Sequence, residues 1–175
     1  MLSIILSPAG FFLVIATYAA GALGALLLGK YDRPANLWGN LFAIAGSVLG
    51  ILFSGAVLIA GTFPAFGIST SFPLLSLTFR IDYLSAFFML LVALIALFCS
   101  IYALGYVGHF SGKYPLGSLG FFYNTFIAAM ILVVTAHHAL CFLLVWEIMS
   151  LTSYFLVIYE HREAENIKAG SLYFI

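Results

Sequence analysis

Charged side chains are scarce in this sequence. They make up 7% of its 175 residues, whereas a soluble domain carries roughly 25%. Hydrophobic residues make up 65%, so a water-soluble fold would have to expose many of the side chains that it should bury. The six basic and six acidic residues also cancel, which removes any charge-based reason to expect a nucleic acid or an acidic partner. Together these shortages indicate an integral membrane protein.

Cysteine is nearly absent as well. Cys99 and Cys141 both lie inside apolar runs, where a cysteine usually behaves as a small buried hydrophobic residue. Their spacing suggests neither a disulfide framework nor a metal site. The sequence also lacks an HExxH motif and a nucleophile elbow, which disfavours an intramembrane hydrolase. We therefore expect no metal or cofactor in this chain.

The sequence contains several long apolar runs. Crossing about 30 Å of hydrocarbon as a helix takes about 20 residues. No basic residue precedes Lys30, and the first run is too long for a signal-peptide core, so we expect that run to be retained as a span. Five runs approach or exceed the required length, at about residues 9–28, 39–60, 81–106, 118–136 and 139–159.

A sixth apolar run begins at about residue 164 and stops at residue 175. Its last nine residues would rise only about 14 Å as a helix, which is half a membrane. The expected fold class is therefore all-α integral membrane, with five transmembrane helices and the start of a sixth. We expect residues 1–175 to form a single membrane domain, the N-terminal part of a longer subunit.

The connections carry two further signals. Leu75 to Arg80 alternates apolar and polar residues, which predicts a strand or hairpin on the membrane surface before the third span. If successive connections alternate sides, Arg80 stands alone on one side, and the positive-inside rule makes that side the outer one. We expect a multi-pass protein of the cell inner membrane with its N-terminus outside. The basic residues of the opposite, cytoplasmic side are Lys30, Arg33, Lys113, Arg162 and Lys168.

The fifth run contains a single ionisable side chain, Glu147, near its middle. A charged group there costs about 2.5 to 3.5 kcal/mol on insertion scales, so intramembrane acids usually have a function. On a helix, Ser150 and Tyr154 lie three and seven positions further along the same face. Tyr123 and Asn124 of the fourth run could join them in lining a hydrated path. The simpler alternative is that Glu147 only forms a hydrogen bond with a neighbouring helix.

Three other residues are weaker candidates. Lys168 would lie roughly 10 Å nearer the inner surface than Glu147, so water would have to bridge the two charges, and a lysine near a helix end often only reaches for the interface. His137 and His138 occupy a tight turn, where they are either interfacial residues or part of a proton relay. We predict that Glu147 and Lys168 take part in ion translocation. The possible relay consists of His137, His138, Ser150 and Tyr154.

Three segments carry a family resemblance. They are residues 79–88, which begin Phe-Arg-Ile-Asp-Tyr, residues 146–155, which begin Trp-Glu-Ile-Met-Ser, and residues 164–175, which contain Lys-Ala-Gly-Ser-Leu-Tyr. The chain resembles the antiporter-like membrane subunits of complex I and group 4 membrane-bound hydrogenases, and most of all the large antiporter-like subunit of formate hydrogenlyase and hydrogenase 4. The match covers residues 75–175, while the first two spans are generic.

The resemblance implies a function. In this family the glutamate that matches Glu147 works with a lysine on a broken helix two spans later, and the pair helps to drive proton movement; Lys168 matches a lysine often found at the start of the sixth span. The chain is thus expected to be part of a proton- or sodium-translocating subunit, with Glu147 as a buried glutamate in the ion path. Nickel-iron and iron-sulfur centres are expected in partner subunits, among the other membrane subunits and a peripheral redox module. The alternative is a structural membrane anchor or assembly subunit without pumping of its own.

Overall fold

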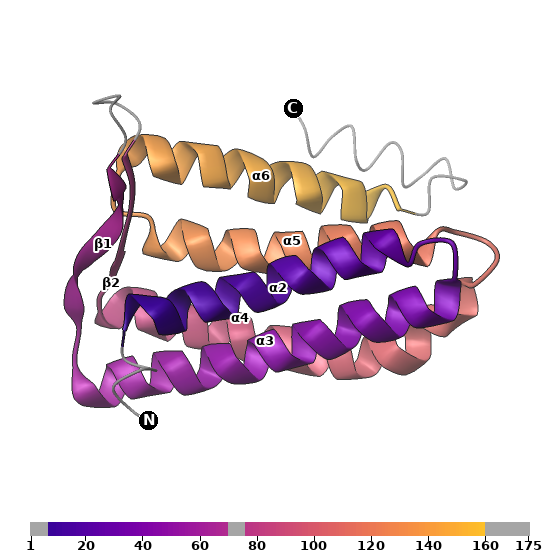
Figure 1. Ribbon diagram of the computed structural model, residues 1–175, viewed down its shortest axis with the longest axis horizontal. Helices are drawn as coiled ribbons and strands as arrows, with labels where there is room; N and C mark the ends of the chain where they lie inside the picture. The colour runs from indigo at the N-terminus through magenta and orange to yellow at the C-terminus, as the bar shows by residue number, and fades with distance from the viewer. Residues whose placement is uncertain (1–6, 70–75, 160–175) are drawn as a thin grey trace.

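The computed structural model describes residues 7–69 and 76–159 of the chain. In these ranges it consists mainly of long helices, with a two-stranded sheet and one short 3-10 helix (Figure 1). Five of the helices are long and apolar enough to cross a membrane, which confirms a multi-pass architecture. The elements are α2 (Pro8–Leu27), α3 (Asp32–Ala60), β1 (Phe63–Ser69), β2 (Ser76–Ile81), α4 (Tyr83–Tyr106), η1 (Val107–Phe110), α5 (Leu116–Thr135) and α6 (Ala139–Val157).

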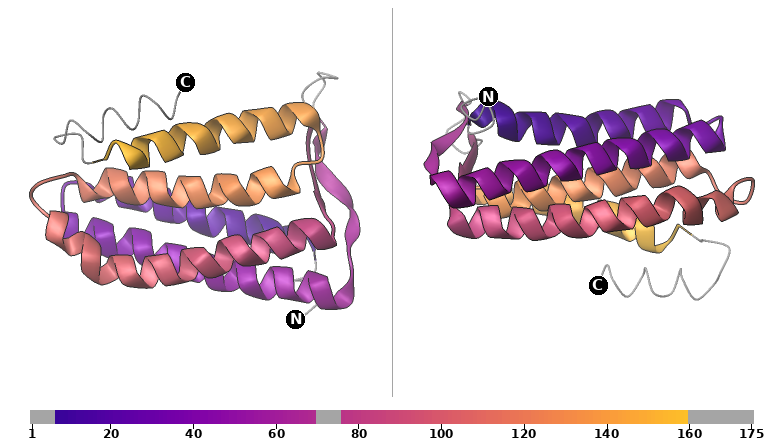
Figure 2. Two further views of the ribbon diagram at one scale, coloured as in Figure 1. Left: turned by 180° about the vertical axis from the view of Figure 1, so that it is seen from behind. Right: turned by 90° about the horizontal axis from the view of Figure 1, so that it is seen from below.

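The helices lie side by side along one common direction (Figures 1 and 2). Helices α2, α3, α4 and α5 form a four-helix group, in which each helix contacts at least two others. Helix α6 lies at one edge of this group and packs against α5 and strand β2. The sheet stands across one end of the bundle. As a result, α6 has a face that the four-helix group does not cover.

Helix α3 begins earlier than the apolar pattern suggested. Its span was expected from about residue 39, but the helix starts at Asp32. An acid and a proline are both favourable in a first helical turn, where Asp32 and Pro34 lie. Asn36, which lies before the expected start of the span, is inside the helix and buried, as is Asn40 four residues further on. The other helix ends lie within two residues of their expected positions.

A seam of small residues joins the three central helices. Ala25 of α2 contacts the region of α3 and α5 where Gly39 and Gly120 face each other: a Cβ built on Gly39 would lie 3.4 Å from both Ala25 Cβ and Gly120 Cα. Small residues allow backbones to approach closely, which is how helices in membranes gain packing energy in the absence of a hydrophobic effect between them. This close approach fixes α2, α3 and α5 relative to one another.

The sheet is an antiparallel pair of β1 and β2, with an irregularity in the register between Phe63 and Phe66. Phe66 and Phe79 lie on Phe11 of α2, with ring centroids 5.5 and 5.6 Å away. The small sheet expected before the third span is thus present, and its assignment to the outer side stays a prediction. The expected start of a sixth helix, at residues 164–175, lies outside the described residues.

Candidate ion-path site

Among the described residues, helix α6 buries one side, which faces α5. Its buried residues are Cys141, Val145 and Thr152, which are four and seven positions apart and so share one face. The Thr152 hydroxyl donates to the backbone oxygens of Ile148 and Met149, at 2.8 and 3.0 Å, so its polar group is satisfied within the helix. The face towards α5 is therefore a packing face.

Glu147 lies on the other side of α6. Its side chain is exposed, and its neighbours Trp146 and Ile148 are 47% and 48% exposed. The three acidic residues of the described ranges are Asp32, Asp82 and Glu147, and none of them is buried. The expectation of a buried glutamate is thus corrected for this part of the chain. The cause is the position of α6 at the edge of the bundle, where α5 covers only the face of Val145.

Ser150 and Tyr154 flank the same stripe of α6 and are both half-buried. The helix face predicted to carry all three residues thus begins at the exposed carboxylate of Glu147 and continues to the partly covered hydroxyls of Ser150 and Tyr154. A hydroxyl can donate and accept a hydrogen bond at once, which suits a side chain on a proton path. Lys168, the predicted cation, lies outside the described residues.

The two histidines hold the start of α6. His138 is the N-cap residue, and its Nδ1 accepts from the backbone N–H of Leu140 at 3.3 Å. The backbone N–H of His137 donates to the backbone oxygen of Thr78 in β2 at 2.9 Å. Next to it, Ala136 forms an isolated β-bridge with Phe79. These contacts give both residues a structural part, and their part in a relay stays a prediction.

A second set of polar groups lies inside the bundle, where sequence reasoning had placed only Tyr123 and Asn124. The amide Nδ2 of Asn124 donates to the backbone oxygens of Gly39 and Gly120, at 3.1 and 2.9 Å. The hydroxyls of Tyr18 and Ser47 are 2.9 Å apart, and so are those of Ser100 and Tyr123. Both hydroxyl pairs join two helices, so they stabilise the bundle through contacts between the helices.

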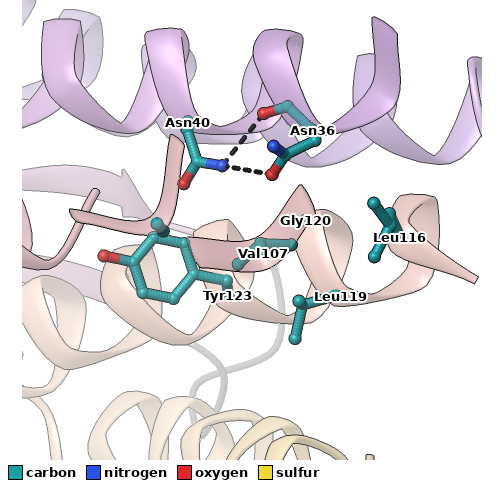
Figure 3. A pocket seen from close by; sticks show the side chains of 8 residues that line it. Asn36, Asn40, Val107, Leu116, Leu119, Gly120 and Tyr123 are labelled. Carbon is teal, nitrogen blue, oxygen red and sulfur yellow. Dashed lines mark hydrogen bonds between the residues drawn. The ribbon is translucent and has the colours of Figure 1, made fainter. Parts of the chain in front are cut away.

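Asn36 and Asn40 belong to this polar interior and were missed. Asn40 Nδ2 donates to the backbone oxygen of Asn36 at 2.9 Å and to its side-chain Oδ1 at 2.7 Å. With Tyr123 they line a cavity between α3, α5 and the end of α4 (Figure 3). Two asparagines spaced by four residues could have been recognised as one helix face, had residues 32–38 been assigned to the helix.

Metal ligands do not gather anywhere in residues 7–69 and 76–159. No group of three or more His, Cys, Asp or Glu side chains there could hold a metal ion. Cys141 is buried on α6 and Cys99 is exposed on α4, far apart in the sequence and on different helices. Within the helices, the described residues therefore offer hydroxyls, amides and the carboxylate of Glu147 for an ion path, and no metal site.

Taken together, the five long apolar helices indicate a multi-pass membrane protein, with a carboxylate on the fifth of them and polar groups between the others. A family model described as NADH-Ubiquinone oxidoreductase (complex I), chain 5 N-terminus, matches residues 69–114. Hydrogenase-4 component B of Escherichia coli (strain K12) is 36% identical over 157 residues, which are 90% of this chain and 23% of that protein. An uncharacterized protein of Mycobacterium tuberculosis (strain ATCC 25618 / H37Rv) is 35% identical over 102 residues, which are 58% of this chain and 15% of that protein.

The matches include a complex I chain and a hydrogenase component. The chain belongs to the family of antiporter-like membrane subunits of complex I and group 4 hydrogenases. It spans less than a quarter of the length of the curated relatives that it matches. The resemblance carried by the three segments of the sequence is thereby confirmed.

Proposed function

We propose that this chain belongs to a proton-translocating, or sodium-translocating, membrane subunit of a redox-driven complex resembling formate hydrogenlyase or complex I. One observation carries the proposal: Glu147 lies near the middle of α6. It is eight residues from Ala139 and ten from Val157, which is about 12 Å and 15 Å along the helix axis. A hydrocarbon layer of about 30 Å therefore places the carboxylate close to its centre.

The exposed face of α6 argues for a partner segment. A carboxylate turned towards lipid at this depth would cost about 2.5 to 3.5 kcal/mol even on the mildest scale. Protein or water must therefore cover Glu147 in the membrane, on the side away from Val145. We propose that the ion path is completed on this face, that its cation comes from Lys168 or from another segment, and that Ser150 and Tyr154 pass protons along the helix.

The surroundings of the subunit follow from the same proposal. We place it in the cell inner membrane with its N-terminus outside, among other membrane subunits and next to a peripheral redox module. Nickel-iron and iron-sulfur centres would belong to those partner subunits. His137 and His138 lie at the start of α6 beside β2 and would connect the path to the outer side.

The test is Glu147→Gln in the full-length subunit within its assembled complex. Glutamine keeps the shape and the hydrogen-bonding capacity of the side chain but cannot release a proton. Cation uptake by vesicles that hold the complex should fall at least tenfold, while the amount of assembled complex stays unchanged. Leu151→Gln is the matched control, because Leu151 is 46% exposed on the same helix, four residues away, and should pump normally.

Normal pumping by Glu147→Gln would refute the ion-path assignment. It would then favour the second candidate, a structural anchor. The anchor hypothesis predicts that Glu147→Gln is silent and that disturbing the helix packing impairs docking of the redox module.

A further inference from the structure

The cavity beside Asn36 and Asn40 has a size that limits what can occupy it. Its volume is about 110 Å³, whereas pockets for drug-sized organic ligands measure roughly 300 to 1,000 Å³. A water molecule takes up about 30 Å³ in the liquid, so the cavity has room for about three. Its walls combine the two asparagines and Tyr123 with the apolar side chains of Val107, Leu116 and Leu119.

One polar atom in the cavity wall is left without a protein partner. Asn40 uses its Nδ2 for both bonds to Asn36, and no hydrogen bond between the described residues uses its Oδ1. Figure 3 shows this oxygen on the side of Asn40 that faces Tyr123. Asn36 and Asn40 are only 8% and 7% exposed as whole residues, so the Oδ1 of Asn40 is an acceptor on an otherwise covered side chain. A water in the cavity could donate a hydrogen bond to it.

The polar groups continue beyond the cavity towards the middle of the bundle. The Tyr123 hydroxyl is 2.9 Å from Ser100 Oγ and 3.2 Å from the backbone oxygen of Ala96. Tyr123 is seven residues into α5, and Ser100 is six residues before the end of α4. The path therefore reaches roughly 10 Å into the membrane from the end of the bundle that holds Lys30 and Lys113, about a third of the hydrocarbon thickness.

We propose that this cavity is a water-filled vestibule that gives protons access to the interior of the subunit, along a route from Asn36 and Asn40 to Tyr123 and Ser100. Water suits the lining better than a metal cation, because the polar side chains of the lining are neutral and no carboxylate is among them. The vestibule lies between α3, α4 and α5, whereas Glu147 lies on the uncovered face of α6.

Proton passage through the vestibule needs no other reactant. A proton that binds to the first water releases a different proton from the last one, and each water and hydroxyl keeps its number of protons. Tyr123 and Ser100 can extend such a chain because each hydroxyl both donates and accepts. The proton-carrying part of the inference rests on the proposed function, while the presence of water does not.

Hydroxyl-radical footprinting of the full-length subunit in its complex tests the hydration. Radicals formed from water label the side chains next to it, and mass spectrometry locates the label. Tyr123 should be labelled at least tenfold faster than Tyr18, a tyrosine of the same bundle that is 0% exposed and bonded to Ser47. Equal labelling of the two tyrosines would show a dry cavity and overturn the proposal.

Asn40→Leu tests the role of the water. Leucine has a similar size but no polar atom, so labelling of Tyr123 should fall to the level of Tyr18 and cation uptake should slow at least tenfold. Uptake at the normal rate through a dried cavity would refute the vestibule. If Asn40→Leu does not assemble, Leu119→Phe fills the cavity from the opposite wall and gives the same two readouts.

The vestibule and the ion-path site can fail separately. Glu147→Gln should stop cation uptake without changing the labelling of Tyr123. If Glu147→Gln pumps normally while Asn40→Leu does not, the vestibule stands and the assignment of Glu147 falls. If Glu147→Gln stops cation uptake and Asn40→Leu does not slow it, the assignment of Glu147 stands and the vestibule is refuted.

Discussion

Replacing Gly117 with alanine should loosen the contact between α5 and α2. A Cβ at this position would lie 2.5 Å from Gly29 Cα and 2.7 Å from the backbone oxygen of Ala25. Both atoms belong to the main chain, so neither can rotate away. Ordinary carbon contacts are about 3.5 to 4.0 Å, which means that α5 would have to retreat by about 1 Å.

The retreat has a calculable cost. Excess volume in a packed core costs about 1 to 3 kcal/mol. A 1 Å shift would also lengthen the hydrogen bond from Asn124 Nδ2 to the backbone oxygen of Gly39, now 3.1 Å, beyond hydrogen-bonding range. Such interhelical bonds in membranes contribute about 0.6 kcal/mol on average. We expect Gly117→Ala to lower the free energy of unfolding by about 2 to 3 kcal/mol.

The assay is reversible unfolding of the full-length subunit in mixed micelles, followed by circular dichroism. Gly55→Ala is the matched control, since a Cβ there would meet nothing within 4 Å and alanine favours a helix by up to about 1 kcal/mol. That variant should be as stable as the parent, or more so. If Gly117→Ala unfolds at the same denaturant concentration as Gly55→Ala, the backbones of α2 and α5 do not approach closely enough to require a glycine.

Two further predictions concern stability. Tyr18→Phe and Ser47→Ala should each lower the free energy of unfolding by about 0.6 to 1.7 kcal/mol, because the two hydroxyls are 2.9 Å apart in the interior. The double variant should lose little more than either single variant. Additive losses would show that the two hydroxyls are not coupled. Asp82→Ala should cost about 1 kcal/mol at neutral pH, since Asp82 caps α4 by accepting from the Ser85 N–H at 2.8 Å. That hydrogen bond holds the pKa of Asp82 below its usual value of 3.8, so the carboxylate stabilises the fold above pH 3.8 and this stabilisation is lost as pH falls through the lowered pKa. Unfolding curves of Asp82→Ala and Asp82→Asn at several pH values check this. A loss of stability in Asp82→Ala that does not vary with pH would contradict it.

The number and order of the helices could be predicted because apolar length is set by membrane thickness. Four of the five spans begin within two residues of their expected positions. The start of α3 could not be predicted, because residues 29–37 form a short polar segment that includes Lys30, Asp32 and Arg33, which is typical of a connection between spans. Strand β2 was predicted from its alternation, whereas its partner β1 contains Pro64 and Gly67 and does not alternate.

The residues of the candidate site could be proposed from the sequence, but their surroundings could not. A single carboxylate in an apolar run identifies Glu147, and helical spacing adds Ser150 and Tyr154 to its stripe. Periodicity cannot say which neighbour covers a stripe, so the exposure of Glu147 depended on the position of α6 at the edge of the bundle. The cavity near Asn40 could not be predicted either, because its walls come from three helices far apart in the sequence.

The attachment of α6 to strand β2 makes the helix a lever. Its first turn is held through the backbone bond between His137 and Thr78 and the bridge between Ala136 and Phe79, so a rigid rotation of the helix would pivot about this end. Glu147 is eight residues from the held end of a helix of 19 residues, and in such a rotation it would move less than half as far as Val157. A conformational signal that arrives at the far end of α6 would reach the carboxylate reduced by that ratio.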